Sequence, residues 1–572
     1  MMFAIPRSVL TVFSKALPIM VISFAVWDRN RDFLQSQNVN NYLTHHIEEF
    51  DFIIVGAGSA GSVLANRLSS NPDYRVLLLE SGGNPNPLQN VPVYFQSLLH
   101  IPELDHGHYT VPQKNVCLAM RDHRSYWPRG LGLGGSSNLN VMNGRFDSIF
   151  KKISKTLRTT MGSITMDGQG IFVNTSAQEN LVDEFLKAGI EMGYPTKDVN
   201  GNQEPSFSRL DFSIKNGRRF GAYQGFLAPV LNRTNLHIYR FAHVNKIHLR
   251  KETNRAYAVT YKRHGLERFV RAKREIIISA GAIDSPKLLM LSGIGPKQHL
   301  ESLGIECRID LPVGKNLMDH ISVPVGPFIE GQLASPIGAN AVAYIYSSLS
   351  KARADFWIKS PDIQLLLLPA NPNLHQTVEE VVGIKPGFIE KYLRGLNAKD
   401  IFMINVMLGK PSSRGEIKLT SKHPWENPIM DPKYFSHSDD IKRVVDGMNF
   451  TVHMAENTEA FRNIGTRLIN KHFPGCEKYE LKTNSYYECY ARHMTYTGYD
   501  QSGTCAMGYG PEDRNAGSSH KRGCVSWMPH ISEIPNGNIN TAVIMAADKA
   551  SELILDYWTH VDNSMRSRPF HF

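Results

Sequence analysis

The chain has 572 residues, a formal net charge of +10, 42% hydrophobic residues and 20% charged residues. This length predicts two or more domains, and this composition excludes a disordered protein because it supplies ample apolar material for a core. The basic residues are spread along the chain and no zinc-finger spacing occurs. We therefore expect no nucleic-acid partner.

The N-terminus has the composition of a targeting segment. Arg7 and Lys15 precede an apolar stretch at residues 16–27, which is shorter than a membrane span and fits the core of a secretory signal. We predict a signal peptide or anchor over residues 1–30 and a secreted or extracellular protein, with membrane contact only through an uncleaved leader. The alternative is an amphipathic or buried N-terminal segment. The polar residues 28–49 that follow predict a linker.

The cysteines and glycosylation sequons agree with secretion. None of the six cysteines has C-x-x-C spacing, so no metal is expected, and Cys476 and Cys489 are the closest plausible disulfide pair. Asn-x-Ser/Thr sequons occur at Asn174, Asn232 and Asn449.

A β–α–β unit begins directly after the linker. Residues 50–55 are almost all apolar and predict a buried parallel strand. Residues 62–69 have helical apolar spacing. Residues 75–79 predict a second buried strand, which ends before Glu80.

The glycines between this strand and helix form a dinucleotide-binding fingerprint. Gly56, Gly58 and Gly61 have G-x-G-x-x-G spacing, Ser59 lies in the same turn, and Glu80 follows the next strand. Gly56 permits the tight turn, Gly58 lets a pyrophosphate approach the backbone, and Gly61 lets the helix pack on the strand. The helix N-terminus favours phosphates, and Glu80 can accept a hydrogen bond from a ribose hydroxyl. The alternative is a Gly-rich turn in an unrelated α/β unit, and the fingerprint alone does not distinguish FAD from NAD.

The rest of the chain predicts further strands and helices. Strand-like runs alternate with Pro-rich turns between about residues 325 and 490, which is typical of a second domain. Strands are expected within residues 235–249, 256–278, 363–368 and 404–408, and helices at residues 285–292 and 542–557.

Four further features of the sequence resemble one enzyme family. Residues 50–83, 127–140 and 281–295 match the glycine-rich signatures of glucose–methanol–choline (GMC) oxidoreductases in order and spacing, and residues 311–320 fit as well. The chain resembles this family over residues 50–557, and it is similar to insect glucose dehydrogenase-like and ecdysone oxidase-like members. An NAD-dependent enzyme would leave the second and third signatures unexplained.

The resemblance implies an α/β and α+β fold, in which a sheet-based substrate-binding domain covers a Rossmann-like FAD-binding domain. The FAD-binding domain is expected at residues 50–325, with substrate-side segments inserted around residues 150–235. The substrate-binding domain is expected at residues 326–490. Residues 491–560 would return to the FAD domain and carry the active-site motifs.

The resemblance also implies FAD as the cofactor. Glycines in the second signature would allow close approach of the backbone to the flavin and its phosphates, and Val244 would lie by the adenine. Besides Gly56, Gly58, Ser59, Gly61 and Glu80, the expected FAD-binding residues are Gly134, Gly135, Ser136, Asn140, Val244 and Asn540.

One residue at the expected catalytic centre differs from the family pattern. Family members transfer a hydride from an alcohol carbon to flavin N5, while a histidine accepts or positions the hydroxyl proton. In residues 499–508, Asp500 occupies the histidine position and Gln501 replaces a proline. A buried carboxylate can be a general base, but it is shorter than imidazole and its charge opposes an anionic reduced flavin. His493 is not a natural substitute.

The expected catalytic partner is Asn538. Three extra residues separate Pro529 from Asn538, and Cys524 stands where the family usually has an Asp that contacts the flavin phosphate. The segment that covers the flavin in relatives is altered over residues 143–158.

Two functions are therefore expected as alternatives. The first is a secreted FAD-dependent oxidoreductase acting on the CH–OH group of an alcohol, sugar or steroid alcohol, with oxygen or a quinone as electron acceptor. The second is a catalytically impaired GMC-like flavoprotein that acts as a binding or structural module, which Asp500 and Cys524 favour. The sequence does not identify the substrate.

Overall fold

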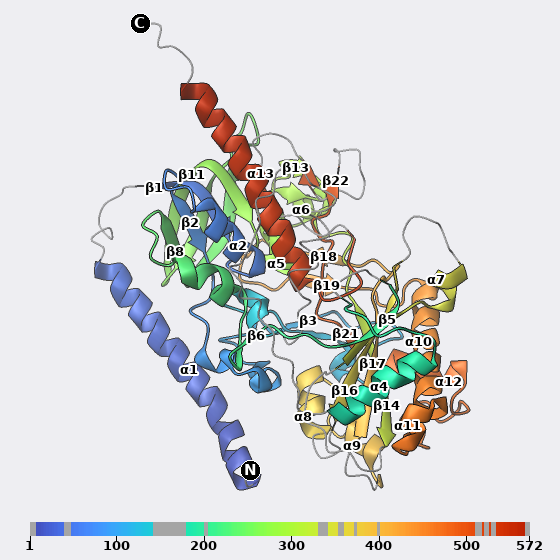
Figure 1. Cartoon of the computed structure of the whole chain (residues 1–572). Helices are drawn as coiled ribbons and strands as arrows, with labels where there is room; N and C mark the ends of the chain where they lie inside the picture. The colour runs from blue at the N-terminus through green and yellow to red at the C-terminus, as the bar shows by residue number, and fades with distance from the viewer. Residues whose placement is uncertain are drawn as a thin grey trace, which may run out of the picture.

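Two seven-stranded sheets form the framework of the protein, and each has its own cover of helices (Figure 1). The computed structural model describes residues 7–38, 47–140, 179–199, 204–329, 341–352, 360–370, 375–396, 401–508, 518–519, 526–527 and 533–566.

The first sheet contains the predicted β–α–β unit. Its order is β8-β2-β1-β11-β10-β9, with β24 beside β11. The strands from β8 to β11 and β24 run parallel, and β9 and β10 join as an antiparallel extension. The bounds are β1 (Glu48–Val55), β2 (Val76–Leu79), β8 (Leu236–Tyr239), β9 (Ala242–Leu249), β10 (Ala256–Arg263), β11 (Leu266–Ile278) and β24 (Ser526–Trp527).

Helices cover the first sheet because its central strands are apolar on both faces. The last six residues of β1 are all buried. Helix α2 (Ser59–Leu68) packs against α13 (Asn540–Arg566), and Figure 1 shows the long α13 lying beside α2. Val63, Leu64 and Ile544 share one buried cluster with Phe52 and Ile54 of β1.

The second sheet is antiparallel. Its order is β20-β14-β17-β16-β15-β5, with β21 beside β14, and α10 packs on it. Strand β14 crosses the expected domain boundary at residue 325, while β5 and β21 come from the segments expected at 150–235 and 491–560. The bounds are β5 (Ser206–Arg209), β14 (Ile321–Ile329), β15 (Ala341–Ile345), β16 (Ile363–Ala370), β17 (Ile401–Leu408), β20 (Arg467–Leu468) and β21 (Tyr496–Thr497).

The remaining elements are helices and very short strands. The helices are α1 (Arg7–Asn38), α4 (Glu179–Glu191), α5 (Gly281–Leu291), α6 (Lys297–Ser302), α7 (Ser348–Ala352), α8 (His375–Val382), α9 (Phe388–Leu393), α10 (Ser438–Asn457), α11 (Glu459–Asn463) and α12 (Asn484–Met494). The strands are β3 (His108–Tyr109), β4 (Tyr126–Trp127), β6 (Ile214–Lys215), β7 (Arg218–Arg219), β12 (Ile294–Gly295), β13 (Ile309–Asp310), β18 (Glu416–Lys418), β19 (Ile429–Asp431), β22 (Met507–Gly508) and β23 (Ser518–Ser519).

Each strand and helix expected from the sequence is present with bounds that differ by a few residues, except that the helix expected at residues 542–557 continues to Arg566. The predicted disulfide between Cys476 and Cys489 is also present. The predicted linker at residues 28–49 is wrong for residues 28–38, which continue helix α1. Among the helices of the described residues, none has both the length and the apolar character needed to cross a membrane.

Helix α1 is held to the first sheet by buried ion pairs, which is why polar residues there are helical. Asp28 and Asp32 are only 1% and 4% exposed. Arg240 donates to both carboxylates, over 2.5 Å to Asp28 and 2.8 Å to Asp32. Asp32 also accepts from Arg263 over 2.9 Å and lies 2.7 Å from His264 Nε2. Because Arg240 lies in the β8–β9 turn, Arg263 ends β10 and His264 lies in the next turn, the charges fix α1 against that side of the sheet.

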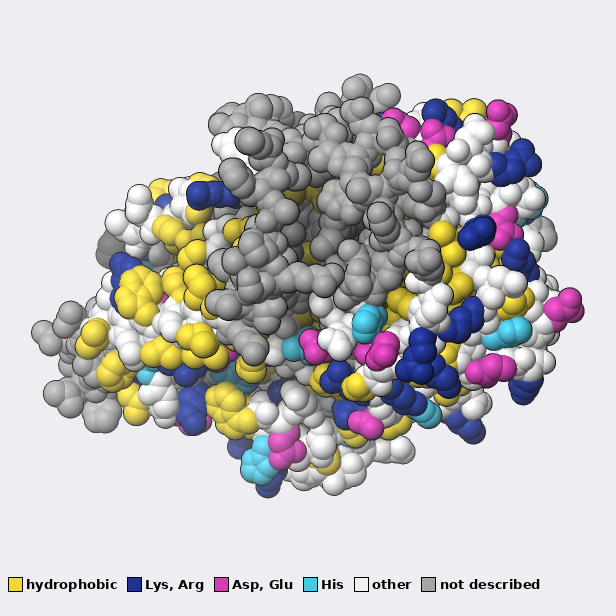
Figure 2. Space-filling model, turned by 90° about the horizontal axis from the view of Figure 1, so that it is seen from below, with side chains coloured by type: hydrophobic (Ala, Val, Ile, Leu, Met, Phe, Trp, Pro, Cys, Tyr) yellow, Lys and Arg dark blue, Asp and Glu magenta, His cyan; other side chains and the backbone are white. Residues whose placement is uncertain are grey.

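The outward face of α1 remains apolar. Leu17 and Val21 are buried, whereas Ile19, Val26 and Trp27 are about half or more exposed. Figure 2 views the molecule from the end at which α1 begins and shows hydrophobic side chains gathered at the left of this face. The helix therefore has two apolar faces, of which one contacts the protein.

Replacing Asp32 with Asn should release α1 locally. The change leaves Arg263 without its buried counter-charge and removes one of the two carboxylates that pair with Arg240, and breaking a buried pair typically costs about 3 kcal/mol. We expect the amides of residues 16–36 to exchange with deuterium roughly 100-fold faster, measured by mass spectrometry. The exposed Glu252→Gln is the matched control and should leave the exchange rates unchanged. Unchanged exchange in Asp32→Asn would show that the ion pairs do not hold the helix.

Candidate active site

A cavity of about 590 Å³ lies between the two sheets. This volume is within the usual range of small-molecule sites. One end is lined by the β1–α2 turn and by the ends of β2 and β11, which are carboxyl ends of parallel strands, the usual ligand position in α/β folds. The other end is lined by side chains of β14, β16 and β17.

The fingerprint glycines are shaped for a ligand that contacts the backbone. Gly56 has φ +95°, and a Cβ on it would lie 2.7 Å from the Ser279 carbonyl oxygen. A Cβ on Gly61 would lie 1.8 Å from the Gly56 oxygen, so the helix can pack here only on glycine. A Cβ on Gly58 would have no described atom within 4 Å and would project into open space. The turn therefore leaves a cradle at Gly58 that a pyrophosphate can fill.

The Glu80 carboxylate joins the two glycine-rich stretches. It accepts from the backbone N–H of Ala57 over 2.8 Å, of Gly82 over 2.9 Å and of Gly132 over 3.2 Å. Glu80 lines the cavity at the end of β2. Its carboxylate thus fixes three backbone segments, and its expected contact with a ribose hydroxyl remains a prediction.

The second glycine-rich stretch packs directly on the first. The Gly134 N–H donates to the Ala57 oxygen over 2.8 Å, and a Cβ on Gly135 would lie 2.8 Å from Gly58 Cα. Two of the expected FAD-binding residues, Gly61 and Gly134, lie behind the cavity wall and shape it from there. The others line the cavity: Gly56, Gly58, Ser59, Glu80, Gly135, Ser136, Asn140, Val244 and Asn540.

Two helix N-termini meet at this part of the cavity. The Ser59 hydroxyl at the start of α2 donates to Asn540 Oδ1 at the start of α13 over 2.5 Å. Asn538 Oδ1 accepts from the Asn540 N–H and from Asn140 Nδ2, each over 3.1 Å. Both N-termini present positive dipole ends, so this region suits the phosphates of a dinucleotide.

Asp500 and His320 form a buried hydrogen-bonded pair in the cavity wall. His320 Nδ1 lies 2.8 Å from Asp500 Oδ2, and their side chains are 0% and 4% exposed. Asp500 lines the cavity, and His320 lies behind it. The Ile539 N–H donates to Asp500 Oδ1 over 3.3 Å. The two expected catalytic residues, Asp500 and Asn538, are therefore brought together, since Asn538 directly precedes Ile539.

The surroundings of His320 fix which of its nitrogens carries a proton. Nε2 lies 2.8 Å from the Pro535 oxygen and 3.1 Å from the Gly409 oxygen, and carbonyl oxygens only accept. Nε2 must therefore be the donor, and a single further proton lies between Nδ1 and Asp500. Burial lowers the pKa of His320, but the hydrogen bond and charge of Asp500 outweigh this effect and raise it overall. The pair favours imidazolium beside carboxylate.

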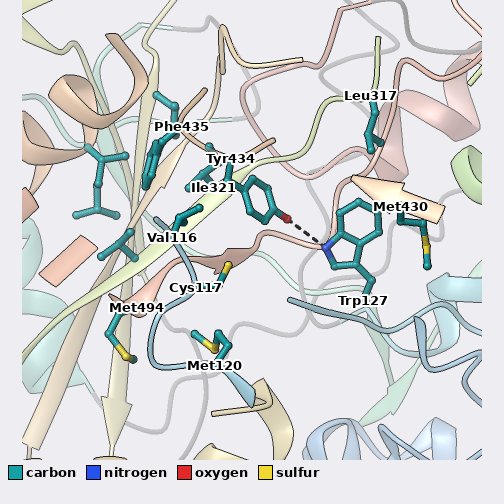
Figure 3. Packing of buried hydrophobic residues seen from close by; sticks show 14 of the residues in the cluster. Val116, Cys117, Met120, Trp127, Leu317, Ile321, Met430, Tyr434, Phe435 and Met494 are labelled. Atoms are coloured by element: carbon teal, nitrogen blue, oxygen red, sulfur yellow. Dashed lines mark hydrogen bonds between the residues drawn. The ribbon is translucent and has the colours of Figure 1, made fainter. Parts of the chain in front are cut away.

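A chain of buried polar groups that begins at Trp127 of β4 supports this pair. Trp127 Nε1 donates to the Tyr434 hydroxyl over 3.1 Å, as the dashed line in Figure 3 marks. The Tyr434 hydroxyl donates to Asp319 Oδ2 over 2.5 Å, and Asp319 Oδ1 accepts from the Asp500 N–H over 3.2 Å. Burial raises the pKa of Asp319 to about 6, and the charge of Asp500 adds to this.

Gln501 and Arg129 complete the polar wall. Gln501 Nε2 donates to Thr497 Oγ1 over 2.8 Å, and its Oε1 accepts from Arg129 over 3.0 Å. Burial lowers the pKa of Arg129, while Asp500 and Asp319 act in the opposite direction. The residue that replaces the family's proline therefore holds a cation near the two carboxylates.

His320 is the main site residue that was not expected from the sequence. It lies in the family-like stretch 311–320, but no spacing links it to Asp500. His493 lies beside the Cys476–Cys489 disulfide and does not line the cavity. Cys524 and the altered segment 143–158 lie outside the described residues.

Comparisons with known proteins agree with these features. The family model described as GMC oxidoreductase matches residues 146–322 in its N-terminal part and residues 411–517 in its C-terminal part. Glucose dehydrogenase [FAD, quinone] of Drosophila melanogaster is 30% identical over 558 residues, covering 89% of this chain and 87% of that protein. Ecdysone oxidase of Bombyx mori is 30% identical over 567 residues, covering 89% and 82%.

Solved structures confirm the expected fold. Pyridoxine 4-oxidase from Mesorbium loti matches with a TM-score of 0.70 at 24% identity, over 88% of this chain and 99% of that one. A fungal aryl-alcohol oxidase matches with a TM-score of 0.66 at 18% identity, over 90% and 100%.

Two glycine substitutions should separate ligand binding from folding. Gly58→Val places its side chain in the open cradle, and its backbone is in an ordinary extended conformation (φ −67°, ψ −164°). We expect this variant to fold like the wild type but to lose bound FAD, measured by flavin absorbance. Gly61→Ala should fail to fold, because its Cβ would overlap the Gly56 oxygen. A Gly58→Val protein that retains FAD would place the pyrophosphate elsewhere.

The raised pKa of Asp319 predicts a pH-dependent loss of stability. An unfolded Asp titrates near 3.9, whereas Asp319 in the folded protein titrates at about 6. The folded state then holds the proton more tightly, so this contribution is complete below about pH 4 and is lost as the pH rises to about 6. Relative to Asp319→Asn, which does not titrate, the wild type should lose roughly 3 kcal/mol over this range in urea unfolding. A constant difference between the two proteins would contradict the assignment.

Proposed function

The chain belongs to the GMC oxidoreductase family, and from this premise we propose that it oxidises an alcohol with Asp500 as the proton acceptor. Its cofactor is FAD, as in its relatives. When bound, FAD supplies the acceptor for the hydride that leaves the alcohol carbon. FAD fits the cavity because the Gly58 cradle and two helix N-termini lie at one end, and the polar wall of Asp500 lies at the other.

The observation that carries the proposal is the position of Asp500 between the cavity and His320. His320 occupies one oxygen of the carboxylate, while Oδ1 receives, among the described residues, only the 3.3 Å contact from the Ile539 N–H. This oxygen can accept the proton of a substrate hydroxyl, because a buried carboxylate within reach is a general base. His320 keeps the carboxylate ionised before the reaction and oriented during it.

Positive charges around Asp500 compensate for the negative charge that a carboxylate brings to this position. A lone negative charge would oppose the build-up of further negative charge in the cavity. Imidazolium at His320 and the guanidinium of Arg129 both act electrostatically on Asp500. When Asp500 takes up the substrate proton it becomes neutral, and the two cations remain. The wall then favours negative charge in the cavity at the point where the reaction creates it.

We further propose that the substrate is a largely apolar alcohol, such as a steroid alcohol, rather than a free sugar. A sugar needs a polar partner for each hydroxyl that it buries. The wall formed by the second sheet and its helices offers few of them. Its side chains include those of Leu366, Leu368, Ile389, Tyr392, Leu393 and Met403.

Secretion is proposed as the location of the protein, with oxygen or a quinone as electron acceptor. The Cys476–Cys489 disulfide supports an oxidising compartment. Of the sequons, Asn232 is exposed, Asn449 is half-buried, and Asn174 lies outside the described residues.

One observation favours the second candidate function, a flavoprotein without catalysis. Asp500 is 3% exposed and already has two hydrogen-bond donors, so a purely structural carboxylate would have the same surroundings. Flavin that is bound but is not bleached anaerobically by any alcohol, sugar or sterol would favour this function.

Replacing Asp500 with Asn should slow reduction of the flavin by substrate. The amide keeps the shape of the side chain but cannot accept a proton, and loss of a general base typically costs 10²–10⁴-fold. Anaerobic stopped-flow absorbance with a panel of sterols, alcohols and sugars measures this rate. Asp556→Asn, at an exposed position of α13, is the control and should react like the wild type. Equal rates in Asp500→Asn and the wild type would remove Asp500 from the reaction.

A further inference from the structure

A His-Gly-His run, His106 to His108, lies close to Asp284 of α5, and His106 and Asp284 line the cavity. We propose that His106, His108 and Asp284 bind one divalent transition-metal ion of the zinc type. This site shares no residue with the expected FAD contacts. The earlier expectation of no metal rested on the cysteine spacing, and this site contains no cysteine.

The local backbone brings the two histidines to one side. Gly107 between them has φ +61°, a left-handed conformation that favours glycine, so the chain turns between the two histidines. The His106 and His108 rings lie parallel, 5.5 Å apart with 3° between their planes. Asp284 lies in the first turn of α5. One ligand atom from each of the three residues lies within 4.8 Å of the other two.

His108 is the second and independent observation that points to a ligand. It is 2% exposed, and both its ring nitrogens are buried without a hydrogen-bond partner among the described residues. An unsatisfied buried polar group costs about 1–3 kcal/mol. Two such atoms on one ring, beside a carboxylate, call for an ion that would satisfy one of them.

Asp284 likewise has no hydrogen bond or ion pair to another side chain of the described residues. Lys287 and His243 act on it electrostatically, and both line the cavity with it. A metal ion would therefore compete with the Lys287 ammonium for the carboxylate, and His243 offers a further imidazole close by.

The chemistry of the ligands selects the metal. Two imidazoles and one carboxylate suit Zn²⁺ and neighbouring transition metals, whereas Mg²⁺ and Ca²⁺ prefer oxygen ligands. Zinc bonds of about 2.0–2.1 Å place tetrahedral ligands roughly 3.4 Å apart. Rotation of the His106 and Asp284 side chains, which are only half-buried, can close the remaining distance. The ion would join the β3 segment to the first turn of α5 and keep one coordination position toward the cavity.

Zinc titration of the FAD-loaded, EDTA-treated protein tests the site. Calorimetry and elemental analysis should find one tightly bound Zn²⁺ per chain, and Co²⁺ in its place should give a visible d–d absorption band. His106→Ala and Asp284→Asn should each weaken Zn²⁺ binding by more than ~100-fold. His375→Ala is the control, because His375 lines the cavity outside this cluster and should leave zinc binding unchanged. Flavin absorbance and circular dichroism verify that each variant is folded.

Two results would overturn the proposal. One is the absence of stoichiometric Zn²⁺ binding by the wild type. The other is unchanged binding in both Asp284→Asn and His106→Ala, which would assign the zinc to other histidines. Asp284→Asn keeps the size of the side chain, so a loss of binding in that folded variant reports on the carboxylate as a ligand.

Discussion

The hydrogen bond between His320 and Asp500 connects residues 180 positions apart and holds a carboxylate in a site that is nearly closed to water. A carboxylate buried alone would take up a proton or move to solvent. Two backbone carbonyls fix the proton on His320 Nε2, so Nδ1 can meet the carboxylate only by sharing the other proton. The proposed chemistry depends on this one constraint, because the bond to His320 orients the carboxylate and leaves its second oxygen with only the long contact from Ile539 among the described residues.

Backbone groups form the binding surface at one end of the cavity, and side chains form it at the other end. At the end formed by the first sheet, glycines and two helix N-termini offer N–H groups and dipoles, which recognise phosphate without sequence-specific side chains. At the other end, charged and amide side chains from residues far apart in the chain converge on one point. Asn538 connects the two regions, since it bonds to Asn140 and Asn540 while its neighbour Ile539 contacts Asp500.

The features that the sequence predicts well are those that depend on near neighbours. The β–α–β unit, its glycine spacing and the Cys476–Cys489 pair involve residues within about thirty positions, and local patterns are informative over such distances. Asp500 and Asn538 could be placed because the surrounding motif keeps its register. The same signal could not identify His320, because a motif position says nothing about which distant carboxylate its imidazole meets.

Helix α1 and the His106 cluster show a second reason why the sequence alone does not predict every structural feature. Asp28 and Asp32 are typical of a solvated linker by composition, and they are helical and buried because Arg240 of the β8–β9 turn and Arg263 of β10 pair with them. In the same way, the His-Gly-His run indicates a metal site only because the fold places Asp284 beside it. In both places a charge pairing set by the tertiary structure overrides the local preference.

Reaction-induced infrared difference spectroscopy tests the central claim most directly, because it detects the protonation of a single carboxylate. On anaerobic addition of an alcohol that reduces the flavin, one carboxylate band should disappear and one protonated carboxyl band should appear, and both should be missing in Asp500→Asn. A spectrum in which the flavin is reduced with no carboxyl change, or with the same change in the variant, would contradict the account.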